Sequence, residues 1–161
     1  MAPAPTRIYD ICVDVLSTVV VNHGGTLPER QYVSAGPPAW DCELLAVHCI
    51  SSAATTDASP IARSAPHLMR SAQVVVTIVR CVPTVDSNGM AVSVPSVVDE
   101  QAAAAVLYGD AQRVVNAVAI GEAAGTIGSC WGVRFLDFAA LGPEGGFAAA
   151  AVSFEIALAG A

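Results

Sequence analysis

The chain has 161 residues, of which 54% are hydrophobic and only 13% are charged, and its formal net charge is −7 at pH 7. This length is typical of one domain with a sizeable core, so residues 1–161 are expected to form a single domain. The acidic balance argues against binding of a phosphate backbone, although it is compatible with a channel through which DNA slides without sticking.

The composition also bears on location and cofactors. No apolar run reaches the ~18 to 20 residues that a membrane span needs, and the N-terminus MAPAPTRIYD lacks the order of a secretion signal. We therefore expect synthesis in the cytoplasm and no membrane anchor. The five cysteines show no C-x-x-C spacing, which predicts reduced core thiols and no metal or other cofactor. So little charge indicates that other subunits cover part of the apolar surface.

The chain begins with a Pro- and Ala-rich stretch, residues 1–5, which is expected to be a flexible tail. Apolar residues then recur at helical spacing and predict a helix over residues 7–22: Ile8, Ile11, Cys12, Val15, Leu16 and Val19. His23, Gly24 and Gly25 should end this helix, with His23 stabilised there as a cation rather than serving as a ligand.

Two extended segments and a loop come next. Residues 27–36 read as a short strand, and alternation from Ala39 onward predicts a second strand. His48 and Cys49 are adjacent on that strand, so they point to opposite faces and cannot form a catalytic dyad. Residues 51–66 contain two prolines and are expected to form a long loop that projects from one end of the sheet.

The stretch RSAQVVVTIVRCVP predicts the central strand, over residues 73–82. Its β-branched residues favour a pleated surface, and the near-continuous apolar run indicates a strand covered on both faces. Arg80 is the exception. Because a guanidinium is rarely buried alone, Arg80 should meet a carboxylate or reach the rim of the sheet.

The last third of the chain predicts a long helix and a hairpin. Ser96 and Asp99 have the spacing of a capping box, and a small apolar stripe follows over residues 97–120, ending at Gly121 or Gly125. Residues 129–139 alternate, with Trp131, Val133, Phe135 and Asp137 on one face, and residues 147–158 form the last strand. The expected fold is α+β: a mixed sheet with two packed helices and a C-terminal β-hairpin.

No catalytic motif accompanies this pattern. The glycines of residues 121–128 follow a helix, whereas a nucleotide-binding loop precedes one. No Ser, His and Asp set has a recognisable spacing, and no motif places a pair of carboxylates. We therefore expect no enzymatic activity.

The order of the predicted elements is accompanied by four characteristic local sequence phrases: LPERQYVSAG, AWDCELLAV, VVTIVRCVPTVD and GPEGGFAAAAVSFEI. Together they resemble the tail terminator, or neck protein, of long-tailed siphophages with GC-rich genomes. The resemblance covers nearly the whole chain but includes no catalytic motif. It implies a tail-terminator-like α+β subunit of a homohexameric ring in the virion. The ring would sit on the head-proximal end of the tail tube, end tube polymerisation and join the tail to the head. Its partners would be the tail tube protein and a head-side connector (stopper), and DNA would pass through its lumen without specific binding.

Functional residues follow from position and charge alone, because the family offers no motif to match residue by residue. We expect contacts between subunits or rings at Arg63, Arg70 and Trp40. Acidic residues are expected at the lumen or its rim: Asp41, Glu43 and Asp57. Two other classes stay open: another connector ring protein (a stopper or adaptor) or minor tail protein, and a small enzyme or ligand-binding domain.

Overall fold

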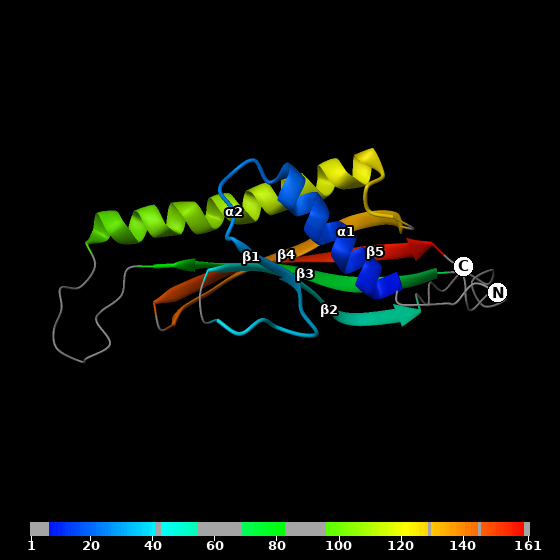
Figure 1. The fold of residues 1–161 in the computed structure, drawn as a ribbon, viewed down its shortest axis with the longest axis horizontal. Coiled ribbons are helices and arrows are strands. Elements are labelled where there is room, and N and C mark those ends of the chain that lie inside the picture. Colours follow the sequence, from blue (N-terminus) through cyan, green and yellow to red (C-terminus); the bar gives the residue numbers. More distant parts are fainter. Residues whose placement is uncertain are drawn as a thin grey trace.

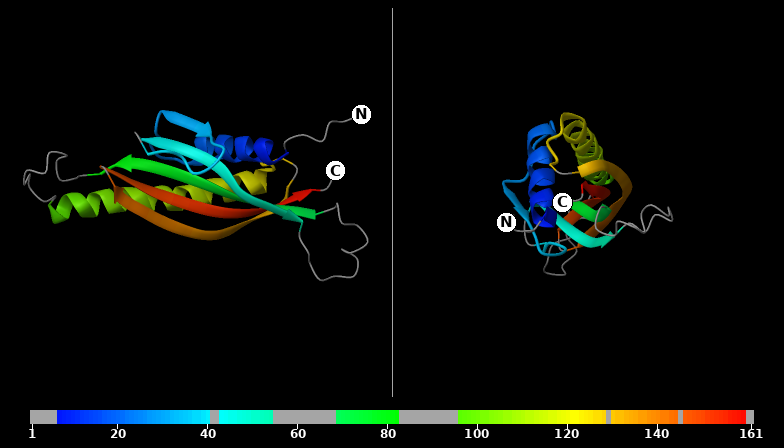
Figure 2. Two further views of the ribbon diagram at one scale, coloured as in Figure 1. Left: turned by 90° about the horizontal axis from the view of Figure 1, so that it is seen from below. Right: turned by 90° about the vertical axis from the view of Figure 1, so that its right-hand side faces the viewer.

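The computed structural model describes residues 7–40, 43–54, 69–82, 96–128, 130–144 and 146–159. Its elements, in chain order, are α1 (Arg7–Asn22), β1 (Arg30–Val33), β2 (Leu44–Ala54), β3 (Met69–Cys81), α2 (Val97–Ala124), β4 (Cys130–Glu144) and β5 (Phe147–Ala159). The strands form one mixed sheet in the order β1-β2-β3-β5-β4, and both helices lie on the same side of it (Figures 1 and 2). The expected α+β fold with a C-terminal hairpin is confirmed.

Strand β3 is central, as its composition predicts. It pairs antiparallel with β2 on one side and with β5 on the other, whereas β1 is parallel to β2. Residues of both faces of β3 are buried, including Val74, Val76 and Ile78 on one face and Val75 and Val79 on the other. A strand covered on both faces needs no alternation of polar residues.

The two faces of the sheet are covered in different ways. The helices cover the main core, in which the largest fully buried side chains include Phe154 and Ile156 of β5. On the opposite face a smaller apolar cluster forms around Leu44 and Val79, and Trp40 packs against it. Figure 1 shows that the segment after β1 runs on the side of the sheet opposite the helices.

Some predicted boundaries are wrong. Residues 51–54 belong to β2 and not to a loop, while residues 55–66 of the predicted loop and the predicted tail 1–5 lie outside the described residues. Of the two predicted ends of the long helix, Gly125 is confirmed: α2 continues through Gly121 to Ala124, and Gly125 caps it with a φ of 69°. The predicted cap at the other end is confirmed, since the backbone N–H of Asp99 donates to the Ser96 side chain at 3.1 Å.

The predicted faces of the segment 129–139 hold only between two β-bulges, the first of which, between Cys130 and Gly132, puts Cys130 on the same face as Val133. The register shifts between Phe135 and Asp137, after which Asp137 pairs with Ser153, and Phe138 pairs with the buried Val152. Phe138 therefore lies on the helix side, where its ring meets that of Tyr108 edge-on at 5.8 Å between centroids. An extra residue in one strand reverses the side on which every later residue projects.

Two glycines of α2 give a matched test of the helix packing. A Cβ atom at Gly121 would lie 2.1 Å from Cγ2 of Thr18 on α1, whereas a Cβ atom at Gly109 would meet nothing within 4 Å. We expect Gly121→Ala to lower the free energy of unfolding by about 1 to 3 kcal/mol because α1 must move away. Gly109→Ala should raise it by about 0.5 to 1 kcal/mol because alanine favours the helix. Urea unfolding of both variants checks this, and equal effects would contradict the close contact.

Candidate functional site

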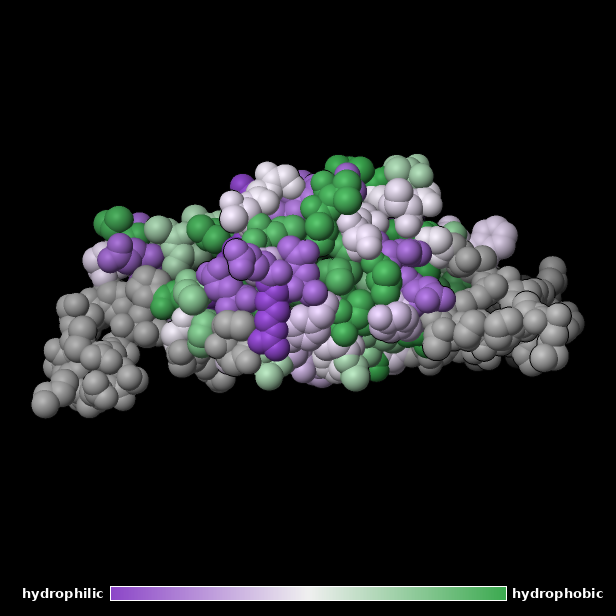
Figure 3. Space-filling view, viewed as in Figure 1, coloured by the Kyte–Doolittle hydropathy of each residue, from purple (hydrophilic) through white to green (hydrophobic). Residues whose placement is uncertain are grey.

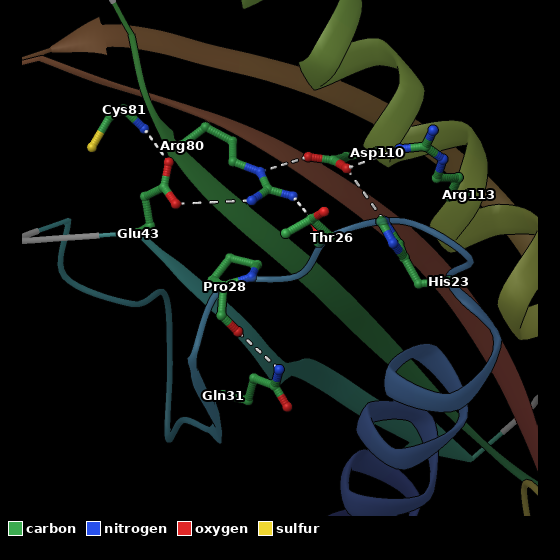
Figure 4. Close-up of polar contacts among 9 residues, drawn as sticks. All are labelled: His23, Thr26, Pro28, Gln31, Glu43, Arg80, Cys81, Asp110 and Arg113. Carbon is green, nitrogen blue, oxygen red and sulfur yellow. Dashed lines mark hydrogen bonds and ion pairs between the residues drawn. The ribbon is translucent and has the colours of Figure 1, made fainter.

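A cluster of charged side chains joins the helices to the sheet. Asp110 of α2 is fully buried, and its Oδ2 accepts a hydrogen bond from Nε of Arg80 on β3 at 2.8 Å (Figure 4). Nη2 of Arg80 also donates to the carbonyl oxygen of Thr26 at 2.6 Å. The expectation that Arg80 meets a carboxylate is confirmed. The bond fixes α2 over the end of the central strand.

Glu43 extends the cluster to the start of β2. Its Oε1 accepts the backbone N–H of Cys81 at 3.1 Å, and its Oε2 lies 3.9 Å from Nη1 of Arg80. The Glu43 side chain is 42% exposed. Its contacts hold the beginning of β2 beside the end of β3, and its expected place at a lumen or rim stays a prediction.

His23 completes the cluster from the end of α1. Its Nε2 lies 3.3 Å from Oδ1 of Asp110, and Nη1 of Arg113 lies 3.9 Å from the same oxygen. Within the described part of the chain, Oδ1 has no hydrogen-bond partner, so the contact between His23 and Asp110 is one of proximity. Burial is the main influence on His23 and lowers its pKa, while the charge of Asp110 opposes that shift. The expectation of a cationic His23 is therefore wrong, because it assumed an exposed ring.

The face of the sheet opposite the helices carries a polar groove of about 310 Å³. Four of its lining residues form one row across the strands, because Ser51 pairs with Gln73, Gln73 with Glu155 and Glu155 with Arg134. Its other lining residues are Ser71 and Leu136. Arg134 and Glu155 form an ion pair on side chains that are 72% and 33% exposed. The groove is open and its charges neutralise each other, which is typical of a hydrated sheet surface.

The second buried histidine, His48, lies on this same face. It pairs with Val75 in the row next to the groove and is 4% exposed, and burial lowers its pKa. Cys49, its neighbour in sequence, packs against the main core on the helix side. The predicted separation of His48 and Cys49 on opposite faces is confirmed, and it leaves no nucleophile and base together at this place.

Among the described cysteines, Cys12 is buried, as expected, whereas Cys49 and Cys130 are half-buried. Burial raises the pKa of Cys12 to about 11 and also raises those of Cys49 and Cys130, which favours the thiol over the reactive thiolate. Cys81 is exposed, so the prediction of a core position is wrong for it. Cys42 lies outside the described residues.

The long edge of the sheet exposes large apolar side chains. We call it the β4-edge surface; it comprises Tyr108 of α2 and four residues of β4: Trp131, Phe135, Leu136 and Leu141. Tyr108 and Phe135 lie on the helix side of this edge, and Leu136 and Leu141 lie on the opposite face of the sheet. Trp131 is 73% exposed. Near the start of β4, Oε1 of Glu122 accepts the N–H of Val133 at 2.8 Å and so protects that part of the edge. At the other edge hydrophilic side chains gather over β1, so the two edges differ in character (Figure 3).

Of the six residues predicted from sequence, the structure describes the side chains of Trp40 and Glu43. Trp40 is half-buried against the smaller apolar cluster. Arg70 pairs through its backbone with Ala54 and Leu158, and its side chain lies outside the description. Arg63, Asp41 and Asp57 also lie outside the described residues. Their expected contacts stay predictions.

Sequence reasoning missed the cluster centred on Asp110. The signal was present, because Asp110 follows the buried Leu107 by three residues and precedes the buried Val114 by four, which places it on the buried stripe of α2. An acid on such a stripe needs a cation, and Arg80 on an apolar strand needs an anion. Matching the two would have predicted the pair.

Comparisons with known proteins add no assignment: no protein-family model matches the chain, and neither does any curated protein. Within the described part of the chain, no group of three or more His, Cys, Asp and Glu side chains could hold a metal ion. No helix among these residues has both the length and the apolar character to cross a membrane.

Proposed function

We propose that the chain is a structural virion protein, a tail terminator that forms a ring at the head-proximal end of a siphophage tail tube. The ring would end tube polymerisation, bind the tube protein on one side and the head-side connector on the other, and let DNA pass. The proposal includes no enzymatic activity and no cofactor. Its support is the resemblance of the local phrases together with one structural observation, the β4-edge surface.

The argument from the β4-edge surface is one of chemistry. An edge strand presents backbone N–H and C=O groups that another chain can pair with. Strand β4 is 15 residues long, from Cys130 to Glu144, and beyond the N–H of Val133, which Glu122 occupies, its outward backbone groups form such an edge. Exposed aromatic and leucine side chains along the same edge favour burial against a partner. In a homo-oligomer such a contact recurs on every copy, and rotation by a fixed angle closes it into a ring. The number six comes from the family resemblance.

A charge placed on the most exposed aromatic side chain of this surface should weaken ring formation. We expect Trp131→Glu to weaken self-association at least tenfold, since it removes a large apolar contact and requires burial of a carboxylate. Val98→Glu is the matched control, because Val98 is equally exposed at 73% but lies in the first turn of α2. Sedimentation of each variant, alone and with purified tail tubes, measures the effect.

The outcomes of this experiment distinguish a wrong contact surface from a wrong function. Rings of normal mass from Trp131→Glu, or an equal loss in both variants, would contradict the contact at β4. A wild-type protein that stays monomeric even with tail tubes would remove the terminator proposal itself. Rings that bind the head-side connector but not tubes would favour the alternative of a stopper or adaptor.

The polar groove supports a second candidate, a small ligand-binding domain. Its row of Ser51, Gln73, Glu155 and Arg134 offers donors and acceptors across four strands. The groove is open, however, and its ion pair is already satisfied internally. Virion structure remains the better-supported function because it uses the apolar surface that a ligand-binding domain leaves unexplained.

A further inference from the structure

The end of α1 lies against α2 at His23, and the ring is close to a cluster of charged side chains. Asp110 and Arg113 face it from α2, and Arg80 reaches the same carboxylate from β3, with Glu43 behind Arg80 (Figure 4). The side chains of His23 and Asp110 are both fully buried. The Asp110 carboxylate therefore already interacts with two guanidinium groups, and the His23 imidazole beside it is excluded from water.

This arrangement favours a neutral His23 over a cation, because burial lowers the pKa of the ring. A protonated ring would gain the charge of Asp110 at 3.3 Å, but it would also face Arg80 and Arg113. A buried charge also loses its hydration, and this loss is the largest influence on the ring. Protonation of His23 thus destabilises the contact between the end of α1 and α2, which we call the closed contact.

The chain has a place to bend directly after this contact. Gly24 has a φ of 71°, a left-handed conformation that suits glycine, and Gly25 follows it. Gly25 lies against the Arg113 side chain, since a Cβ atom there would be 2.6 Å from Nη1. Residues 23–25 can therefore move out from under Arg113 without moving the sheet, because the bond between Arg80 and Asp110 does not involve them.

We propose that His23 is an acid-sensitive latch: the neutral ring holds the C-terminal end of α1 and residues 23–25 against α2, and protonation releases them, while the carbonyl of Thr26 stays bonded to Arg80. The released ring reaches water, where its charge is hydrated. The Arg80–Asp110 bond keeps α2 on β3 in the open form. This inference does not depend on ring formation or on the proposed virion role.

The pH window follows from the direction of the pKa shift. The closed form holds the pKa of His23 below the ordinary value of 6.5, which an open, hydrated ring keeps. Above that value neither form binds the proton, and the closed contact has its full stability. Below it the open form alone binds the proton, so the opening equilibrium rises by up to about tenfold per pH unit until the lowered pKa is reached.

Amide hydrogen exchange followed by NMR tests the latch. The backbone N–H of His23, which bonds to the carbonyl of Val19 at 2.9 Å, reports on the end of α1. Its protection, corrected for the intrinsic exchange rate, should fall by up to about tenfold per unit below about pH 6.5. The N–H of Thr126, bonded to the carbonyl of Gly121 at 2.9 Å, reports on the far end of α2 and should not follow it.

Two histidine variants separate this latch from general acid unfolding. His23→Gln cannot be protonated and should abolish the pH dependence at the end of α1. His48→Gln should leave that dependence intact, because His48 is equally buried but lies on the other face of the sheet, and burial alone lowers its pKa.

A pH response that survives in His23→Gln, or that spreads equally to Thr126, would overturn the latch. If His23→Gln fails to fold, titration of the wild-type ring signals keeps the test decisive. A His23 pKa at or above the ordinary value would then overturn the proposal.

Discussion

Replacement of Val76 by aspartate is expected to lower the free energy of unfolding by several kcal/mol, enough to leave much of the protein unfolded. Val76 is fully buried at the centre of β3, between its partners Val47 of β2 and Val152 of β5. A carboxylate there has no cation within the described core, and an unpaired buried charge is among the most destabilising of substitutions. Thermal unfolding followed by circular dichroism measures the change.

The same substitution at an exposed valine is the control. Val98 is 73% exposed in the first turn of α2, where a negative charge favours the helix dipole. Val98→Asp should therefore leave stability unchanged or raise it slightly. Comparable melting temperatures for the two variants would contradict the central place of β3 in the core.

Sequence predicted the parts of the fold that depend on local pattern. The run of β-branched residues predicted β3 as the central strand, because few other structures suit such a run. The Ser96 cap was predictable because it depends on residues only three apart. Helix α1 was predictable in the same way, because the spacing of its apolar residues identifies its buried face. These features need no knowledge of what lies across the fold.

Other features depend on distant partners and could not be predicted in this way. The bulge after Phe135 exchanges the faces of Asp137 and Phe138, which a single alternation extended over the whole segment does not allow for. The extension of β2 beyond Ile50 depends on its pairing with β3. Residues 51 and 52 are polar, so the sequence alone predicts a loop there. His23 shows the same limit, because its burial depends on α2, about 90 residues later.

The second large effect is expected at Arg80. Arg80→Met keeps the length of the side chain but leaves Asp110 buried without the bond to Nε, and the carbonyl of Thr26 loses its donor as well. Removal of one partner of a buried ion pair typically costs about 3 to 5 kcal/mol, because the remaining charge has lost its hydration. Arg134→Met is the matched control: its ion pair with Glu155 is largely exposed, and such pairs contribute about 0 to 1 kcal/mol.

A second substitution at Asp110 shows whether the cost comes from the orphaned charge. In Arg80→Met combined with Asp110→Leu, no buried carboxylate remains, and an apolar pair of similar volume can replace a buried ion pair at little cost. We expect the double variant to recover most of the stability lost in Arg80→Met, giving a coupling energy of about 2 kcal/mol or more in denaturant unfolding. His23 would then face leucine in place of a carboxylate and should stay neutral to lower pH. Additive losses in the double variant would mean that Arg80 acts mainly through Thr26 and packing, and that the bond to Asp110 is not what fixes α2 on the sheet.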